Sequence, residues 1–218
     1  VYRRAVLGQM IPWSDGILLP EFRVGRSIVD FLAVTDPLHA VEIKSDLDNT
    51  SRLDSQLHDY RKIAPLVSVM ASKRVVERLL AAREFETVGL HWLNVNGRVE
   101  TVRNAEFSRE YLDSEVLTRS LRRAEYLRVL SALGSTVPDL PNTRVFSYAL
   151  AASRDLDPLI FHNAVADQLR ARKPRAGRTL IAKLPEPVRP AVLKLDPTRQ
   201  QISSLQDWMN QEVANVYA

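Results

Sequence analysis

The chain has 218 residues, of which 45% are apolar and 26% charged, as is typical of a soluble globular protein. It contains no cysteine, which excludes disulfides, thiolate metal sites and a cysteine nucleophile. No apolar run is long enough for a membrane helix, and the first eight residues lack the apolar stretch of a signal peptide. We therefore expect a cytoplasmic protein without a membrane partner, and its net charge of +4 is compatible with a polyanionic one.

Three strands are expected first along the chain. Residues 17–24 form an apolar run that includes Pro20, which cannot donate a ladder hydrogen bond and so favours an edge or bulged position. Residues 27–35 and 40–45 are two β-type runs on either side of a turn at residues 36–38. This pattern predicts a hairpin.

The middle of the chain alternates between helical and strand patterns. Residues 48–51 are types that cap helices, and the helix that they open is expected to stop at Pro65. Residues 66–71 are nearly all apolar, as expected for a strand in the buried middle of a mixed sheet. Ser72 is expected to cap a second amphipathic helix. The pattern then predicts strands over residues 87–94 and 98–103, and one long helix over residues 108–133 with Gly134 after its last turn.

The last third of the chain is helical and rich in proline. Helices are expected over about residues 143–153 and 158–172. A terminal amphipathic helix carrying Trp208 is expected to dock on the body or on another subunit, which would give a homo-oligomer. The predicted fold class is α/β: a core over residues 1–137 with a mixed β-sheet flanked by helices, and a helical C-terminal appendage over residues 138–218.

Charged residues interrupt the predicted hairpin at Asp30, Glu42 and Lys44. Strand interiors rarely accept ions without a strong partner, because desolvating an unpaired charge is costly. All three residues stand at even positions, so a connecting loop of odd length would place them on one face of the sheet. An even loop would separate Asp30 from the other two, whereas Glu42 and Lys44 share a face in either case.

A divalent metal ion is the expected partner of two carboxylates and one ammonium group. Two carboxylates a few ångströms apart repel each other, so one of them normally takes up a proton. A bound Mg²⁺ reverses that balance, keeps several waters and acidifies one of them into a nucleophile. A lysine beside the ion can orient or deprotonate this water and stabilise charge on a phosphate. The arrangement predicts metal-assisted hydrolysis of a phosphodiester.

At this point the sequence resembles a known superfamily. Asp30 followed by Glu42–Lys44, each on a predicted strand, is similar to the motif of the PD-(D/E)XK nucleases, which have the restriction-endonuclease-like fold. Glu21 lies upstream, where many members carry an acidic residue. Gln56 and Tyr60 match the Gln-x-x-x-Tyr motif of the RecB-like branch, which implies that they orient the site and the substrate. The resemblance covers residues 17–72, about a quarter of the chain.

The resemblance implies a role for each residue of the motif. Asp30 and Glu42 would bind Mg²⁺ or Mn²⁺, with the backbone carbonyl of Ile43 as a further oxygen donor. Glu21 would support the metal, and Lys44 would position or activate the water. The implied enzyme is a metal-dependent nuclease with a restriction-endonuclease-like core, and DNA is the expected substrate because most relatives cut it.

Other interpretations of these residues stay open. Glu42 and Lys44 could form an ordinary cross-strand pair on a solvated face, and Glu21 could guard an edge strand against aggregation. Tyr60 could be a core aromatic of its helix. Two alternative functions are a non-catalytic nucleic-acid-binding module on the same fold, and an RNA-cleaving toxin or defence effector.

Two further features of the sequence concern binding. A basic run without an intervening acid could bind a phosphate backbone or form a solvated connector. Its members are Arg170, Arg172, Lys173, Arg175, Arg178 and Lys183. The four histidines, His39, His58, His91 and His162, show no spacing typical of metal ligands.

Overall fold

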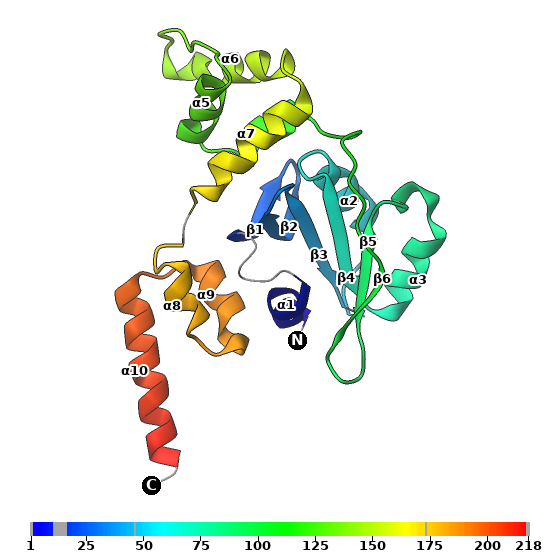
Figure 1. Ribbon diagram of the computed structural model, residues 1–218, viewed down its shortest axis with the longest axis vertical. Helices are drawn as coiled ribbons and strands as arrows, with labels where there is room; N and C mark the ends of the chain where they lie inside the picture. Colours follow the sequence, from blue (N-terminus) through cyan, green and yellow to red (C-terminus); the bar gives the residue numbers. More distant parts are fainter. Residues whose placement is uncertain (1, 11–16, 46, 173, 217–218) are drawn as a thin grey trace.

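The computed structural model describes residues 2–10, 17–45, 47–172 and 174–216, although not the side chains of Arg178 and of residues 211–216. Within these ranges six strands form one sheet, in the order β1 to β6 (Figure 1). The strands are β1 (Ile17–Val24), β2 (Ser27–Val34), β3 (His39–Lys44), β4 (Leu66–Ala71), β5 (Gly89–Leu93) and β6 (Val99–Arg103).

The sheet is mixed. Strands β1, β2 and β3 pair antiparallel, β3, β4 and β5 pair parallel, and β5 and β6 pair antiparallel. Because helices flank this sheet, the predicted α/β class is confirmed. β1 lies at one edge of the sheet, where the missing N–H of Pro20 is tolerated. The described helices begin with α1 (Tyr2–Ala5), η1 (Val6–Met10), α2 (Leu53–Arg61), α3 (Lys73–Ala81) and η2 (Arg83–Phe85), and continue with α4 (Ser114–Arg119), α5 (Arg123–Ala132), α6 (Asn142–Arg154), α7 (Pro158–Arg170), α8 (Arg178–Ala182), η3 (Glu186–Val188), α9 (Arg189–Leu195) and α10 (Arg199–Val216).

Two apolar clusters lie on the two faces of the sheet. Neighbouring residues on one strand, such as Val69 and Met70, belong to different clusters because side chains alternate along a strand. One cluster joins its face to α2, α3 and the helices α4 to α7. The other joins the opposite face to α1, η1, α8 and α9. Burial on both faces holds the central strands in a fixed register.

The long helix predicted over residues 108–133 is wrong, since the structure has two shorter helices there. The carboxylate of Asp113 accepts hydrogen bonds from two backbone N–H groups in the first turn of α4, so the helix begins after this cap. α4 ends at Arg119, and the carboxylate of Glu125 accepts from the backbone N–H of Arg122 at the start of α5. The predicted end at Gly134 is confirmed, because this residue follows α5 with a left-handed φ of 81°.

The helix cap predicted at residues 48–51 is also wrong. α2 begins at Leu53 with Arg52 as its N-cap, and no side chain of this cap bonds to the helix. The carboxylate of Asp48 instead accepts hydrogen bonds from the backbone N–H and the hydroxyl of Ser45, at 2.6 and 2.7 Å. The polar cluster therefore organises the turn after β3, where a short side chain can bond to nearby backbone.

The helices after the sheet form two groups. α4 and α5 contact α6 and α7, so contacts run across position 137, and the predicted domain boundary there stays a prediction. α9 packs against the edge strand β1. Figure 1 shows α10 extending away from the rest of the molecule. Ile202 on this helix is buried, whereas Trp208 is exposed, and docking on another subunit stays a prediction. Among the described residues, no helix has both the length and the apolar character needed to cross a membrane.

Candidate metal centre

Asp30 and Glu42 lie on the neighbouring strands β2 and β3, each one position beyond the last pair of their ladder. The ladder between these strands pairs Ala33 with His39 and ends where Phe31 faces Val41. Residues 34–38 lie between the paired positions Ala33 and His39, so the connection is odd in length. Continuing the same register by one step would pair Asp30 with Glu42, but the ladder stops before this pair. The connection has the odd length that the prediction required, but β2 changes its facing at Asp30, so a shared face of the two carboxylates stays a prediction.

β2 is irregular at Asp30, and the carboxylate of Asp30 bonds to the backbone of the neighbouring strand β3. Val29 belongs to one apolar cluster and Phe31 to the other, so the facing of β2 reverses at Asp30. Oδ2 of Asp30 accepts a hydrogen bond of 2.9 Å from the backbone N–H of Ile43. This bond stands where a ladder bond would otherwise join the two strands. β3 remains paired with β4 as far as Lys44.

Glu42 is held at both of its carboxylate oxygens. Oε1 lies 2.7 Å from Nζ of Lys44, two residues along the same strand. Oε2 accepts a hydrogen bond of 2.7 Å from the hydroxyl of Tyr60 on α2. Gln56, one turn earlier on α2, donates through Nε2 to the oxygen of Tyr60 at 3.2 Å. Since Glu42 is only 2% exposed, these contacts fix a buried carboxylate.

Burial disfavours the charged forms of both acids, and repulsion from Asp30 further disfavours the charged form of Glu42. Burial raises the pKa of Asp30, although the hydrogen bond from Ile43 and the charge of Arg3 oppose the change. Burial raises the pKa of Glu42, and the negative charge of Asp30 raises it further. Burial and the charge of Glu42 also raise the pKa of Tyr60, so its phenol stays protonated and donates.

The residues present fit a hard divalent cation. A positive ion between Asp30 and Glu42 would favour the charged forms that burial disfavours, and would offset the repulsion that raises the pKa of Glu42. No group of three or more histidine, aspartate or glutamate side chains suited to a metal occurs among the described residues. Two carboxylates are nevertheless a common protein contribution to a Mg²⁺ site, because this ion keeps several waters. The carbonyl of Ile43 as a further donor stays a prediction.

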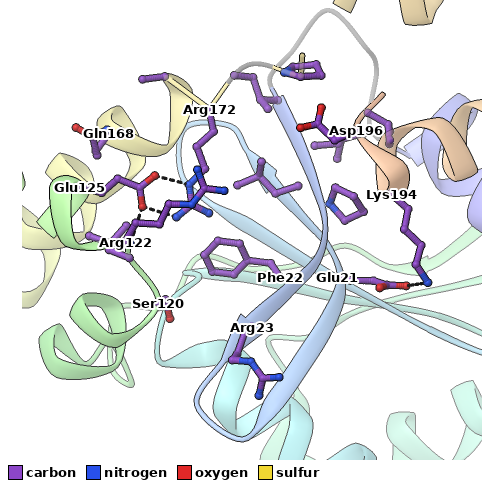
Figure 2. A pocket seen from close by; sticks show the side chains of 18 of the residues that line it. Glu21, Phe22, Arg23, Ser120, Arg122, Glu125, Gln168, Arg172, Lys194 and Asp196 are labelled. Carbon is purple, nitrogen blue, oxygen red and sulfur yellow. Dashed lines mark hydrogen bonds and ion pairs between the residues drawn. The ribbon is translucent and has the colours of Figure 1, made fainter. Parts of the chain in front are cut away.

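Glu21 forms ion pairs with two basic side chains, one of which also contacts Asp30. It lies between Pro20 and Phe22, which pair with β2 on either side of Asp30, and it has a left-handed φ of 49°. Its Oε1 lies 2.7 Å from Nζ of Lys194 (Figure 2) and 3.4 Å from Arg3. Arg3 also lies 2.9 Å from Oδ1 of Asp30, so its guanidinium bridges the two acids. The hydrogen bond from Lys194 lowers the pKa of Glu21, and a role for Glu21 as a metal ligand stays a prediction.

A cavity of about 710 Å³ lies along β1 and is lined by Glu21 at one position. Its other walls come from the α4–α5 connection, the end of α7 and α9 (Figure 2). Its basic side chains are Arg23, Arg119, Arg122, Arg128, Arg172 and Lys194, against the acids Glu21, Glu125 and Asp196. Within the described part of the chain, Arg23, Arg122 and Arg128 form no ion pair. The cavity therefore carries an excess of positive charge, with Glu21 at one position of its lining.

Two residues of the predicted basic run are held by acidic side chains. Arg172 bonds to both oxygens of Glu125 at 2.7 and 2.5 Å, and Arg170 pairs with Asp167. Lys173 lies outside the described residues. Paired arginines are less available to phosphate than unpaired ones, so the exposed arginines that line the cavity are the better candidates for nucleic-acid contact.

Sequence reasoning missed Arg3 and Lys194. Both lie far along the chain from the acids that they contact, and no local pattern marks them.

Residues 4–195 match a family model described as Bacteriophage P4 protein cII. No curated protein and no solved structure matches the chain. Because the matched range covers most of the 218 residues, the chain belongs to the bacteriophage P4 cII protein family.

Proposed function

We propose that this protein is a metal-dependent nuclease of the PD-(D/E)XK type, which hydrolyses phosphodiester bonds and acts on DNA. The observation that carries the proposal is the proximity of Asp30 and Glu42, from two neighbouring strands, with Lys44 and Tyr60 each bonded to Glu42. These contacts bring together residues that are between two and thirty positions apart in sequence. An ordinary solvated strand face would leave Glu42 exposed, whereas it is buried.

The side chains divide the work of the reaction. Asp30 and Glu42 would hold Mg²⁺ or Mn²⁺, which when bound supplies an acidified water and withdraws charge from a phosphate. The ammonium of Lys44 uses one donor on Glu42 and keeps others for the attacking water or a phosphate oxygen. Tyr60 and Gln56 are positioning residues, because they reach the centre only through Glu42.

The unpaired arginines of the 710 Å³ cavity support a polyanionic substrate. Arginine binds phosphate through a planar pair of donors, and neutralising a phosphate backbone releases counterions. Because Glu21 lines this cavity and shares the ion pair of Arg3 with Asp30, a strand lying in the cavity would lead toward the acidic pair.

A second function has one observation in its favour. The guanidinium of Arg3 lies on Oδ1 of Asp30, and an arginine that stays there could replace the metal ion as the counter-charge. The protein would then be a non-catalytic nucleic-acid-binding module on the same fold. The two functions predict different effects of a divalent ion. The nuclease would cut nucleic acid when the ion is added, whereas the binding module would bind nucleic acid without cutting it.

Cleavage of labelled DNA and RNA, single-stranded and duplex, in Mg²⁺ or Mn²⁺ tests the proposal. The wild-type protein should cut at least one substrate, and Asp30→Asn and Lys44→Ala should each lower the rate by about 100-fold or more. Lys73→Ala, an exposed lysine on α3, is the matched control and should cut like wild type. Binding without cleavage in either ion would favour the non-catalytic module. Undiminished cleavage by both variants would overturn the assignment of the site.

A further inference from the structure

A second polar cluster lies on the other face of the sheet, at the opposite end of β3 from Lys44. His39 is the first residue of β3, and its Nε2 lies 2.8 Å from the hydroxyl of Ser68 on β4. Nε2 of His91 on β5 lies 3.4 Å from the same hydroxyl. Nδ1 of His91 lies 3.0 Å from the hydroxyl of Thr101 on β6. Two imidazoles thus converge on one oxygen.

The cluster opens on a cavity of about 550 Å³. Its lining contains no aspartate, glutamate, lysine or arginine, and its two titratable groups are His39 and His91. The lining residues are Gln9, Met10, His39, Leu66, Ser68, His91, Val99, Thr101, Asn104 and Ala105. The cavity therefore differs in character from the arginine-rich cavity along β1.

Both imidazoles are neutral at physiological pH. Burial lowers the pKa of His39 to about 4, and the neighbouring His91 contributes. Burial also lowers the pKa of His91. A neutral imidazole has a free lone pair and is the form that binds metals. The hydroxyl of Ser68 has a single proton, so it can donate to one imidazole while it accepts from the other.

One distance in this cluster matches an edge of a coordination sphere, and the other is a hydrogen-bond length that metal binding would lengthen. In a tetrahedral zinc site with Zn–N near 2.0–2.1 Å, neighbouring ligand atoms lie about 3.3 Å apart. The two measured edges to the hydroxyl of Ser68 are 2.8 and 3.4 Å. Gly89 leaves room for this hydroxyl, because a Cβ at that position would lie 2.4 Å from its oxygen.

We propose that His39, His91 and the hydroxyl of Ser68 form a binding site for a divalent transition-metal ion of the Zn²⁺ or Ni²⁺ class. Imidazole nitrogen suits these ions, whereas Mg²⁺ prefers oxygen. Thr101 orients the ring of His91 through its second nitrogen, as the outer contacts of metal-bound histidines do. The cavity leaves room for water or another small ligand on the ion. This site is separate from the acidic pair and does not depend on the proposed nuclease function.

Calorimetric titration of the full chain with Zn²⁺ and with Ni²⁺ tests the site. The wild-type protein and Asp30→Asn should bind one equivalent that excess Mg²⁺ does not displace. His39→Gln and His91→Gln should each weaken binding about tenfold or more. His58→Gln is the matched control, because His58 is exposed and pairs with Glu84, and it should bind like wild type. Equal affinity in wild type, His39→Gln and His91→Gln would overturn the proposal.

Two measurements on wild-type protein keep the test decisive if a variant does not fold. The electron paramagnetic resonance spectrum of bound Cu²⁺ should show coupling to two imidazole nitrogens, and a spectrum without nitrogen coupling would contradict the site. Between pH 7 and 5.5, two imidazoles of ordinary pKa lose about 70-fold in metal affinity through protonation. The pair of His39 and His91 should lose much less. A loss as large as that of ordinary histidines would assign the metal to surface residues instead.

Discussion

The hydroxyl of Tyr60 lies 2.7 Å from Oε2 of Glu42, which it reaches from α2 across 18 positions of sequence. Lys44 occupies the other oxygen of the same carboxylate at 2.7 Å. Glu42 is therefore oriented by contacts within the protein, independently of any substrate. Outer contacts of this kind commonly decide how well a carboxylate binds a metal ion.

Tyr60→Phe keeps the buried ring and removes only the hydroxyl. Loss of an outer contact to a metal ligand typically costs about 10- to 100-fold in metal affinity or activity. We expect a decrease of that size in Mn²⁺ affinity and in cleavage, with a loss of about 1 kcal/mol in the free energy of unfolding. Titration calorimetry and urea unfolding measure the two effects. A variant that loses stability but binds and cuts like wild type would reduce Tyr60 to a core residue.

The dependence of stability on pH should show that burial disfavours the ionised form of Asp30. The folded-state pKa of Asp30 is raised, so its contribution to stability is present below its ordinary pKa of 3.8 and is lost as pH rises through the raised value. Asp30→Asn stays neutral throughout. We therefore expect the melting temperature of wild type, in chelator, to fall relative to Asp30→Asn between pH 4 and pH 7.

Divalent ions supply the control for this pH series. At pH 7 added Mg²⁺ or Mn²⁺ should stabilise wild type by mass action and leave Asp30→Asn unchanged. If the difference in melting temperature between wild type and Asp30→Asn does not vary with pH, burial does not disfavour the ionised form of Asp30.

Arg3→Gln should favour metal binding. Arg3 competes for Oδ1 of Asp30, and its side chain is 39% exposed. Because partly exposed ion pairs contribute about 1 kcal/mol or less, the gain in apparent Mn²⁺ affinity should be about fivefold or less. Arg4→Gln changes an exposed arginine of the same helix that pairs with Glu186, and it should have no effect. A weaker Mn²⁺ affinity in Arg3→Gln would make Arg3 a support of the centre rather than a competitor.

The arginines of the cavity along β1 should set the salt dependence of nucleic-acid binding. In an Asp30→Asn background without divalent ions, Arg23→Ala and Arg128→Ala should each lower the slope of log K against log salt by about 1. Arg74→Ala on α3 is the matched control, because Arg74 is exposed and does not line this cavity. Fluorescence anisotropy at four or five salt concentrations measures the slopes. Equal slopes in all three variants would mean that the arginines of this cavity do not contact the nucleic acid.

The sequence predicted the hairpin and its charged residues because both depend on short-range patterns. Alternation along β3 places Glu42 and Lys44 on one face whatever the rest of the chain does. Helical spacing likewise places Gln56 one turn before Tyr60. The facing of Asp30 depended on the length of the turn, which hydrophobic pattern alone does not determine.

Long-range contacts were beyond prediction. Arg3 and Lys194 approach Glu21 only because α1 and α9 pack near the edge strand β1. His39 and His91 have no ligand spacing in sequence, and parallel pairing through β4 brings them to Ser68. The long helix predicted over residues 108–133 was wrong for a local reason, since its apolar period continues through the break that Asp113 and Glu125 define.

The central claim is that Asp30 and Glu42 jointly hold a divalent ion. A crystal structure of the full chain in Mn²⁺, with anomalous data at the manganese edge, tests it most directly. We predict an anomalous peak within about 2.3 Å of a carboxylate oxygen of each residue, with Arg3 moved off Oδ1 of Asp30. A structure in saturating Mn²⁺ that has no peak at this pair, with Arg3 still bonded to Asp30, would contradict the account.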